Sequence, residues 1–300
     1  MNLLVTGGAG DIGTTVVTAI REQHAVTILD RQASTHHQDL PFIKLDLENA
    51  SETVSAVQGF DVVVHLAAIP DPFSDPDDVV FRLNCLSTFN LLEAVRMNGI
   101  RRIVYGCSES ASGLGIHNRM YQPEYLPIDE EHPSWPHEGY SLSKYFGEVM
   151  CEEYSRAYDI EGISLRYAWV WGGARNQDQW MRLLAQEANT GGEKDWLGAW
   201  IAVADVAQGI RLACDFQFTD QDPRFERFYL TARDNFTGND TLHLVHERWP
   251  NQPPPIRKPA LYVDNPKASV FDYSKATQML GYTPSVNADA LRDKFGIPRR

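Results

Sequence analysis

Two residues near the middle of the chain have the types and the spacing needed for proton transfer. Tyr140 and Lys144 are four positions apart, so they lie on one face if this stretch is helical. An ammonium group beside a phenol favours the phenolate and lowers the phenol pKa from about 10 toward the working pH. Such a tyrosine can take the proton of an alcohol while a hydride leaves the alcohol carbon. Pairs of this kind are common on protein surfaces, so a catalytic role for this pair has to be inferred from the rest of the chain.

A glycine-rich stretch near the amino terminus could hold a cofactor that receives the hydride. TGGAGDIG places Gly7, Gly10 and Gly13 at three-residue spacing, directly after the apolar run 2–6 and at the start of a helical pattern. These glycines permit a tight turn, close approach of the backbone to a pyrophosphate, and close packing of helix on strand. The helix that follows offers free N–H groups and a positive dipole end to the phosphates.

A second apolar run, 25–30, ends in the acidic residue Asp30. An acid about 20 residues beyond the glycines accepts hydrogen bonds from the adenosine ribose of a dinucleotide. A carboxylate there also repels a 2′-phosphate, which predicts NAD rather than NADP as the cofactor. The neighbouring Arg31 weakens this preference slightly.

The elements that must position these residues alternate along the first two thirds of the chain. Nearly continuous apolar runs indicate strands buried on both faces. Their alternation with helical patterns predicts a parallel, doubly wound sheet with right-handed crossovers, an α/β fold of the Rossmann type. The expected strands are 2–6, 25–30, 42–45, 61–66, 102–107, 163–169 and 226–231, and the expected helices are 12–23, 49–58, 78–98, 140–158, 177–189, 203–214 and 274–280.

The pattern changes after about residue 172, where glycine-rich and proline-rich stretches appear. We expect residues 1–172 to form an NAD-binding domain, to which 201–231 returns as a helix and a strand. Residues 173–200 and 232–300 are expected to form a small C-terminal substrate-binding lobe. Such a lobe would cover the carboxyl ends of the strands, where open α/β sheets bind their ligands.

The composition argues against several other classes of protein. The chain has 27 basic and 40 acidic residues and a formal net charge of −13, so we expect no nucleic-acid binding through a basic surface. We find no signal-peptide pattern and no apolar run near the ~20 residues of a membrane span, so we expect a cytoplasmic protein without a membrane partner. The four cysteines are far apart in the sequence, so no metal site is predicted.

The order of several motifs resembles the extended short-chain dehydrogenase/reductase superfamily, also called the NAD-dependent epimerase/dehydratase family. The resemblance covers most of the chain, and it rests on the order and spacing of the motifs rather than on any one of them. The motifs are TGGAGDIG at 6–13, Asp30, Asp46-Leu47, HLAA at 65–68, Asn84 within FRLNCLSTFNLLEAV, SESASGLG at 108–115, Tyr140-x-x-x-Lys144, LRYAWVWG at 165–172 and IAVADVAQGI at 201–210.

The resemblance implies roles for the matching residues. Tyr140 would be the acid/base, and Lys144 would bind the nicotinamide ribose and lower the tyrosine pKa. The catalytic hydroxyl is expected five residues before Gly115, at Ser110, with Ser108 as the alternative because this motif departs from the common S-S-x-x-x-Y-G form. The residues expected to hold NAD are Gly7, Gly10, Asp11, Ile12, Gly13, Asp30, Arg31, Asp46, Leu47, Leu66, Ala67, Ala68, Asn84, Tyr140 and Lys144. The residues expected to contact the substrate are Ser108, Ser112, Trp169 and Arg175.

An acidic residue, Asp11, stands inside the loop that would hold the pyrophosphate. The resemblance implies that the backbone amides of Asp11 and Ile12 face the phosphates. A carboxylate in the first turn of a helix is favoured by the helix dipole. We therefore expect the Asp11 side chain to point away from the phosphates.

The serine, tyrosine and lysine are compatible with three reactions of the superfamily. A dehydrogenase releases an oxidised product, an epimerase returns the hydride to its substrate, and a 4,6-dehydratase needs an acid pair after the catalytic hydroxyl. Ser110 is followed by Ala111 and Ser112, which disfavours a dehydratase. Residues 172–202 are thin cover for a nucleotide diphosphate, so we predict an NAD-dependent oxidoreductase acting on a small sugar, sugar acid or polyol. A UDP-hexose 4-epimerase with tightly bound NAD and a non-catalytic NAD-binding regulator remain as alternatives.

The expected partner is a second copy of the chain. Members of the superfamily often dimerise by pairing the helices that match 78–98 and 140–158 into a four-helix bundle. Apolar residues on these helices would supply the interface, although burial against their own sheet would explain the same residues. They are Val79, Val80, Leu83, Leu86, Leu91, Val95, Phe146, Val149 and Met150.

Overall fold

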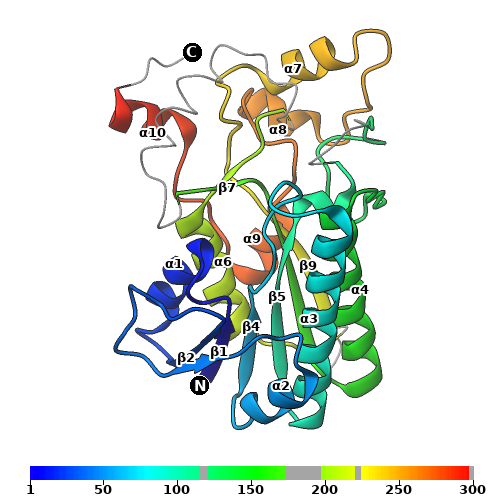
Figure 1. Cartoon of the computed structure of the whole chain (residues 1–300). Helices are drawn as coiled ribbons and strands as arrows, with labels where there is room; N and C mark the ends of the chain where they lie inside the picture. Colours follow the sequence, from blue (N-terminus) through cyan, green and yellow to red (C-terminus); the bar gives the residue numbers. More distant parts are fainter. Residues whose placement is uncertain (115–120, 173–196, 220–223, 297–300) are drawn as a thin grey trace.

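Seven parallel strands form the centre of the molecule (Figure 1). The computed structural model describes residues 1–114, 121–172, 197–219 and 224–296. The strand order is β3-β2-β1-β4-β5-β6-β9, and each neighbouring pair is parallel. This is the predicted Rossmann-type sheet, and its order reverses between β1 and β4, the place where such sheets bind dinucleotides. The strands are β1 (Asn2–Thr6), β2 (Ala25–Asp30), β3 (Phe42–Lys44), β4 (Val62–His65), β5 (Arg102–Ser108), β6 (Glu161–Tyr167) and β9 (Phe225–Leu230).

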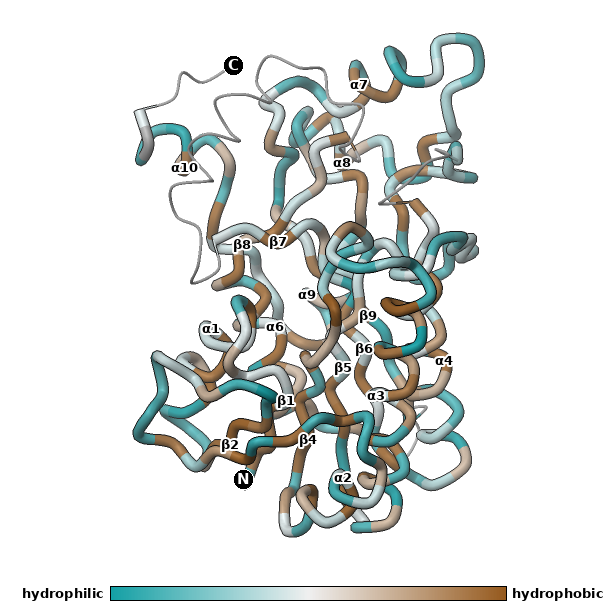
Figure 2. Tube along the Cα trace, viewed as in Figure 1, coloured by the Kyte–Doolittle hydropathy of each residue, from teal (hydrophilic) through white to brown (hydrophobic). Residues whose placement is uncertain are grey.

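Helices cover both faces of the sheet, which explains why its strands are apolar on both sides. Along β1, Leu3 and Val5 belong to one hydrophobic cluster and Leu4 to the other, because successive side chains of a strand point to opposite faces. Figure 2 shows the hydrophobic residues following the central strands. The first cluster includes residues of α1 (Asp11–Ile20) and α6 (Val203–Asp215), and the second includes residues of α3 (Asp77–Met97) and α4 (Gly139–Tyr158).

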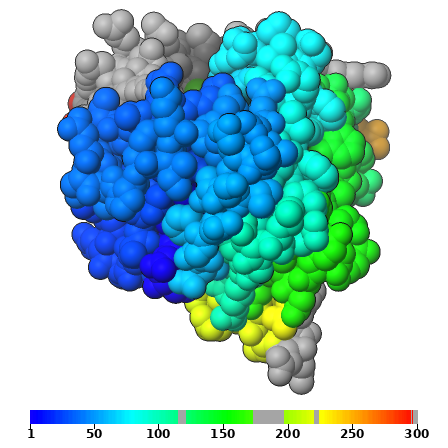
Figure 3. All heavy atoms as spheres, turned by 60° about the horizontal axis from the view of Figure 1, so that its bottom comes forward, coloured from blue at the N-terminus to red at the C-terminus, as the bar shows by residue number. Residues whose placement is uncertain are grey.

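The helices α3 and α4 pack against each other along their length, and α2 (Ala50–Ala56) packs against α3. Figure 3, seen from the lower end of Figure 1, shows the amino-terminal residues in blue, the following residues in cyan and the α4 region in green side by side. None of the helices in the described part of the chain combines the length and the apolar character that crossing a membrane requires.

Most of the remaining elements lie toward the upper end of Figure 1, beyond the carboxyl ends of the strands, whereas α9 (Ser274–Leu280) packs against β9 and α6. The segment between the serine motif and α4 joins this region, because Leu126 bridges to Ile256 and Ile128 to Phe271. Whether the chain divides into two units at the expected boundaries stays a prediction. The elements are η1 (Glu109–Ser112), β7 (Val170–Trp171), β8 (Ile201–Ala202), α7 (Thr241–Arg248), α8 (Pro259–Asp264), α9 (Ser274–Leu280) and α10 (Ala288–Phe295).

The expected elements of residues 1–172 are present with ends that differ by up to three residues. The main difference is β6, which runs from Glu161 to Tyr167 and therefore leaves Trp169 outside the strand. Three short helices, α7, α8 and α10, were not predicted, and the proline-rich crossing ends where Pro259 starts α8. The expected helix at 177–189 and most of the expected lobe segment 173–200 lie outside the described residues.

Candidate active site

The glycine loop is a tight turn on which α1 rests directly. Gly7 has a φ of 72°, and its amide donates to the carbonyl oxygen of Leu29 at 2.9 Å. The Gly10 amide donates to the Gly7 oxygen at 3.0 Å. A Cβ on Gly13 would overlap the carbonyl oxygen of Gly7 and lie 2.7 Å from Gly8 Cα, so only glycine permits this contact between helix and loop.

The amino-terminal end of α1 has the properties that a pyrophosphate requires. Gly10 is the N-cap residue, and no side chain caps this end of the helix. Among the described residues, a Cβ on Gly10 would meet only the Gly7 oxygen, at 3.2 Å, so none of them fills the space next to this cap residue. The Asp11 side chain is exposed. These residues fit the pyrophosphate of NAD, which the helix dipole would stabilise.

The acid that ends β2 lies beside the glycine loop, as expected for a ribose ligand. Asp30 Oδ2 accepts a hydrogen bond from the Ala9 amide at 3.1 Å, and Oδ1 accepts one from Gln32 at 3.3 Å. Arg31 is exposed, and its Nη1 lies 4.0 Å from Asp46 Oδ2. The carboxylate is therefore part of the loop, whereas the arginine is directed toward another acid.

Other expected cofactor residues lie against the glycine loop and form a wall beside it. A Cβ on Gly7 would lie 2.6 Å from the Ala67 nitrogen, so the segment of Leu66, Ala67 and Ala68 follows β4 directly against the glycines. Leu47 is buried in the cluster under α3. Asn84 on α3 ties the end of this wall to α4, since its Oδ1 accepts from the Ile69 amide at 2.8 Å and its Nδ2 donates to Ser143 Oγ at 3.0 Å.

The first turn of α4 is fixed on both sides, and this holds Tyr140 in place. Glu138 caps the helix, because its carboxylate oxygens accept from the Tyr140 and Ser141 amides, each at 2.6 Å. A Cβ on Gly139 would lie 2.8 Å from Asp77 Cα, so the two helix starts touch at this glycine. The tyrosine backbone therefore has little freedom to move.

Lys144 is buried one turn further along α4. Its Nζ donates to the Gly106 carbonyl oxygen at 2.9 Å and lies 5.8 Å from the centre of the Tyr140 ring. Burial lowers the pKa of Lys144 to about 8, because an ammonium group loses solvation away from water. The structure thus brings the predicted pair together on one helical face.

The environment of the tyrosine differs from the expectation in its effect on the phenol. Tyr140 is almost fully buried, and burial raises the pKa of its phenol well above 10. The nearby Tyr167 and Glu109 act in the same direction, and a hydrogen bond with Ser108 opposes them. In the protein by itself, desolvation of the phenolate thus shifts the pKa in the direction opposite to the one expected beside Lys144, and the effect of Lys144 with NAD bound stays a prediction.

The serine motif turns away from the sheet immediately after β5. Ser108 ends the strand and caps η1 by accepting from the Ser110 amide at 3.2 Å. Ser110 is fully buried and donates its hydroxyl to Ser108 Oγ at 2.9 Å. Ser112 is also fully buried, and its hydroxyl donates to the Glu109 carbonyl oxygen at 2.6 Å. The hydroxyl that bonds Tyr140 is thus that of Ser108, and the Ser110 hydroxyl donates to the same oxygen.

The sequence analysis missed an acid within this motif. Glu109 is 8% exposed, and its Oε2 accepts from Ser108 Oγ at 3.2 Å. Burial raises the pKa of this carboxyl to about 7. Its signal in the sequence is the glutamate between the two candidate serines.

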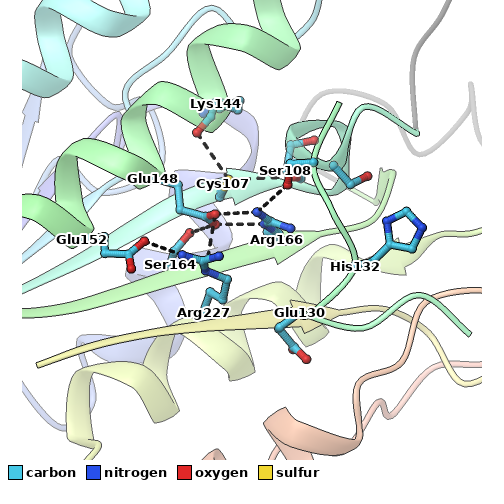
Figure 4. A network of polar contacts seen from close by, with 12 residues as sticks. Cys107, Ser108, Glu130, His132, Lys144, Glu148, Glu152, Ser164, Arg166 and Arg227 are labelled. Carbon is cyan, nitrogen blue, oxygen red and sulfur yellow. Dashed lines mark hydrogen bonds and ion pairs between the residues drawn. The ribbon is translucent and has the colours of Figure 1, made fainter. Parts of the chain in front are cut away.

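A buried ion pair, also missed, holds α4 against β6 (Figure 4). Arg166 donates to both oxygens of Glu148, at 2.6 and 3.0 Å, and also to Tyr229 and Ser134. Arg227 lies 3.6 Å from the same carboxylate. This network fixes the helix that carries Tyr140 and Lys144. The sequence signal for the ion pair is the arginine and the glutamate, which stand in otherwise apolar patterns.

An exposed aromatic side chain lies at the same edge of the sheet as the serine motif. Ser108 is in register with Tyr167, and Trp169 follows two residues later. Trp169 is 38% exposed and rests against Trp171, at 5.5 Å between ring centres, and Phe236, at 6.1 Å. Arg175, the other expected substrate residue, lies outside the described residues.

A glycine loop that fits a dinucleotide lies at the carboxyl edge of a parallel sheet, together with the buried Tyr140 and Lys144. These features define a nicotinamide-dependent enzyme with the Rossmann fold. The chain belongs to the NAD dependent epimerase/dehydratase family, which it matches over residues 3–225. The expected superfamily and the expected cofactor, NAD, are thereby confirmed.

The relatives of the chain include enzymes of more than one reaction type. It is 26% identical to a UDP-glucose 4-epimerase of Corynebacterium glutamicum, over 95% of this chain and 91% of the relative. It is 28% identical to an L-arabinose 1-dehydrogenase (NAD(P)(+)) of Haloferax volcanii, over 73% of this chain and 84% of the relative. A crystal structure of UDP-galactose 4-epimerase is 26% identical, with a TM-score of 0.70 over 98% of this chain and 97% of that one. The comparisons therefore support an NAD-dependent enzyme without selecting its reaction.

Proposed function

We propose that the protein is an NAD-dependent dehydrogenase that oxidises a hydroxyl of a small sugar, sugar acid or polyol. The observation that carries this proposal is the exposed side chain of Trp169, two residues beyond the position paired with Ser108. An indole face packs against the C–H face of a sugar ring, whereas it offers a diphosphate no charge and only one N–H donor. An exposed indole at this edge of the sheet thus suits a small carbohydrate better than a nucleotide.

Each residue of the site has a separate role in this reaction. The glycine loop and Asp30 would hold NAD, which would accept the hydride. Tyr140 takes the proton of the substrate hydroxyl, and the Ser108 hydroxyl bonded to it holds the reacting oxygen in position. Lys144 is held by the Gly106 carbonyl oxygen, and its ammonium group would bind the nicotinamide ribose.

A nucleotide-sugar 4-epimerase is the second candidate function. It is favoured by the relative from Corynebacterium glutamicum, which is similar over nearly the whole chain and is a UDP-glucose 4-epimerase. In that reaction the same tyrosine would take and return the proton, so the geometry of Tyr140 and Ser108 suits both reactions.

A substrate panel separates the two candidates. The purified protein would be incubated with NAD and free pentoses, hexoses, uronates and polyols, and in parallel with UDP-hexoses. We expect net NADH absorbance with at least one free carbohydrate and no interconversion of UDP-hexoses. Interconversion of UDP-hexoses without net NADH would contradict the dehydrogenase and support the epimerase.

We also propose that the protein is a homodimer that pairs α3 and α4 with those of a second copy. These helices pack together and leave large apolar side chains exposed, among them Leu86 at 36%, Phe89 at 45% and Phe146 at 43%. Apolar side chains that gather on an exposed face commonly mark an interface.

Charged residues in this surface are expected to yield monomers. The double variant Leu86→Glu, Phe146→Glu should run near 33.9 kDa by light scattering, whereas the wild type should show twice that mass. Val263→Glu is the matched control, because Val263 is 78% exposed on α8, away from these helices (Figure 1). A monomeric wild type, or a double variant that remains dimeric, would refute this interface.

A further inference from the structure

The histidine of the HLAA motif is buried beside the glycine loop and takes no part in the proposed proton transfer. His65 is 2% exposed and ends β4, directly before the segment 66–69. A buried imidazole is costly unless its nitrogens find hydrogen-bond partners. Both nitrogens of His65 have one, since Nδ1 lies 2.8 Å from Thr6 Oγ1 and Nε2 lies 3.1 Å from Thr88 Oγ1. The ring therefore joins β1, β4 and α3.

The two threonine hydroxyls determine which ring nitrogen carries the proton. Thr88 Oγ1 donates its single proton to the Asn84 carbonyl oxygen at 2.8 Å, so toward His65 it can only accept. Nε2 of the ring is therefore protonated, and Nδ1 accepts the proton of Thr6 Oγ1. Burial lowers the pKa of His65 to about 3, which agrees with a ring that stays in this neutral form. Each proton of the chain of hydrogen bonds is thus used once.

One end of this chain lies at the glycine loop. Thr6 directly precedes Gly7, and its Oγ1 accepts from the Ala67 amide at 3.4 Å. The loop and the segment after β4 touch each other, because a Cβ on Gly7 would lie 2.6 Å from the Ala67 nitrogen. A change in the position of His65 would therefore change how these two parts of the NAD site fit together.

The other end of the chain lies on α3 and continues to the helix of the acid/base tyrosine. Asn84 holds the end of the segment after β4, since its Oδ1 accepts from the Ile69 amide at 2.8 Å. Its Nδ2 donates to Ser143 Oγ at 3.0 Å, and Ser143 Oγ donates to the Tyr140 carbonyl oxygen at 2.7 Å. Buried polar contacts thus run without interruption from the glycine loop to the first turn of α4.

We propose that His65 is a positioning residue for the cofactor, which fixes the glycine loop, the segment 66–69 and α3 in the arrangement that NAD binding requires. The ring acts through its two threonine partners. An apolar side chain could fill the same space, but apolar packing tolerates small shifts. A buried polar network in which every group is satisfied instead fixes one arrangement.

Two substitutions that keep the side-chain shape break the chain on either side of the ring. Thr6→Val removes the donor to Nδ1, and Thr88→Val removes the acceptor of Nε2. Each should raise the Kd for NAD by about tenfold in a calorimetric titration. Thr88→Ser keeps the hydroxyl and should bind NAD like the wild type.

Thr241→Val is the matched control for a general loss of stability. Thr241 is also fully buried, and its hydroxyl donates to the Ala268 carbonyl oxygen at 2.6 Å and accepts from Asn235 Nδ2 at 2.9 Å. It begins α7, at the upper end of Figure 1 and away from the glycine loop. This variant should lose a similar free energy of unfolding in urea and keep the wild-type Kd for NAD.

The double variant Thr6→Val, Thr88→Val separates positioning through the ring from two independent effects. If His65 transmits the constraint, either substitution already breaks the link, so the double variant should bind NAD about as weakly as a single one. Independent effects would multiply to a Kd about 100-fold above that of the wild type. That multiplication, unchanged affinity in both single variants, or an equal loss in Thr241→Val would overturn the proposal.

Nitrogen-15 spectra of the histidine-labelled wild type give a readout that needs no variant. They should contain a neutral ring protonated at Nε2 that stays neutral down to about pH 5, where an ordinary histidine is charged. A spectrum without such a ring would overturn the proposed hydrogen-bond chain. These measurements use NAD alone or no ligand, so their outcome is independent of whether the protein is a dehydrogenase or an epimerase.

Discussion

Replacing Tyr140 by phenylalanine is expected to lower kcat by about 10²–10⁴-fold, the usual contribution of a positioned acid/base group. The substitution removes only the phenolic oxygen, and the ring keeps its packing at the start of α4, where Glu138 caps the helix. NAD affinity should therefore stay near that of the wild type, because the glycine loop and Asp30 are untouched. Steady-state kinetics and calorimetric NAD titration would measure the two effects separately.

Tyr105→Phe is the matched control for this variant. Tyr105 is also buried, and Lys144 Nζ lies 5.4 Å from its ring centre, but its hydroxyl faces the Lys144 carbonyl oxygen at 3.5 Å. We expect this variant to retain most of its activity. Full activity in Tyr140→Phe, or an equal loss in both variants, would contradict the assignment of Tyr140 as the acid/base.

Alanine at Gly10 is expected to weaken NAD binding with little loss of stability. Its Cβ would meet only the Gly7 oxygen at 3.2 Å, and the φ of −76° suits any residue, so the fold should tolerate it. The methyl group would, however, enter the space above the first amides of α1 that the pyrophosphate needs. A rise in Kd of at least about tenfold corresponds to about 1.4 kcal/mol and is readily measured by calorimetry.

Alanine at Gly13 should instead damage the loop itself. Its Cβ would overlap the Gly7 carbonyl oxygen and crowd Gly8, so α1 must shift away from β1. We expect the free energy of unfolding to fall by about 1–3 kcal/mol, as for other overpacked sites, together with loss of NAD binding. Urea denaturation of both variants separates the two effects. Unchanged NAD affinity in Gly10→Ala would show that the cofactor does not lie over the amino-terminal end of α1.

The sequence was sufficient to predict the part of the fold that repeats a simple pattern. Leu3, Leu4 and Val5 are apolar without alternation because helices cover both faces of β1, and this pattern is readable in one dimension. The helix α10 could not be predicted in this way. Its amino-terminal end is held by Asn287 and by Asp234, whose carboxylate accepts from the Ala288 amide, and the second of these contacts depends on a distant loop.

The residues of the active site could be predicted from the sequence, but their burial and the turn that orients them could not. The spacing of Tyr140 and Lys144 predicted that they share one face of the helix, yet it contained no information on burial. Burial makes the pKa shift of the phenol opposite in direction to the expected one. The choice between the two serines likewise depends on the turn after β5. That turn is set by Gly113, with a φ of 79°, and by the Trp135 amide, which donates to the Ser112 oxygen at 2.8 Å.

The fate of the hydride tests the proposed reaction most directly. A uniformly deuterated carbohydrate that the protein accepts would be incubated with NAD, and the products would be analysed by mass spectrometry. The dehydrogenase predicts one deuterium in each NADH and an equal amount of oxidised carbohydrate. Deuterium that stays entirely in a sugar with one inverted hydroxyl, without accumulation of NADH, would contradict the account and establish an epimerase instead.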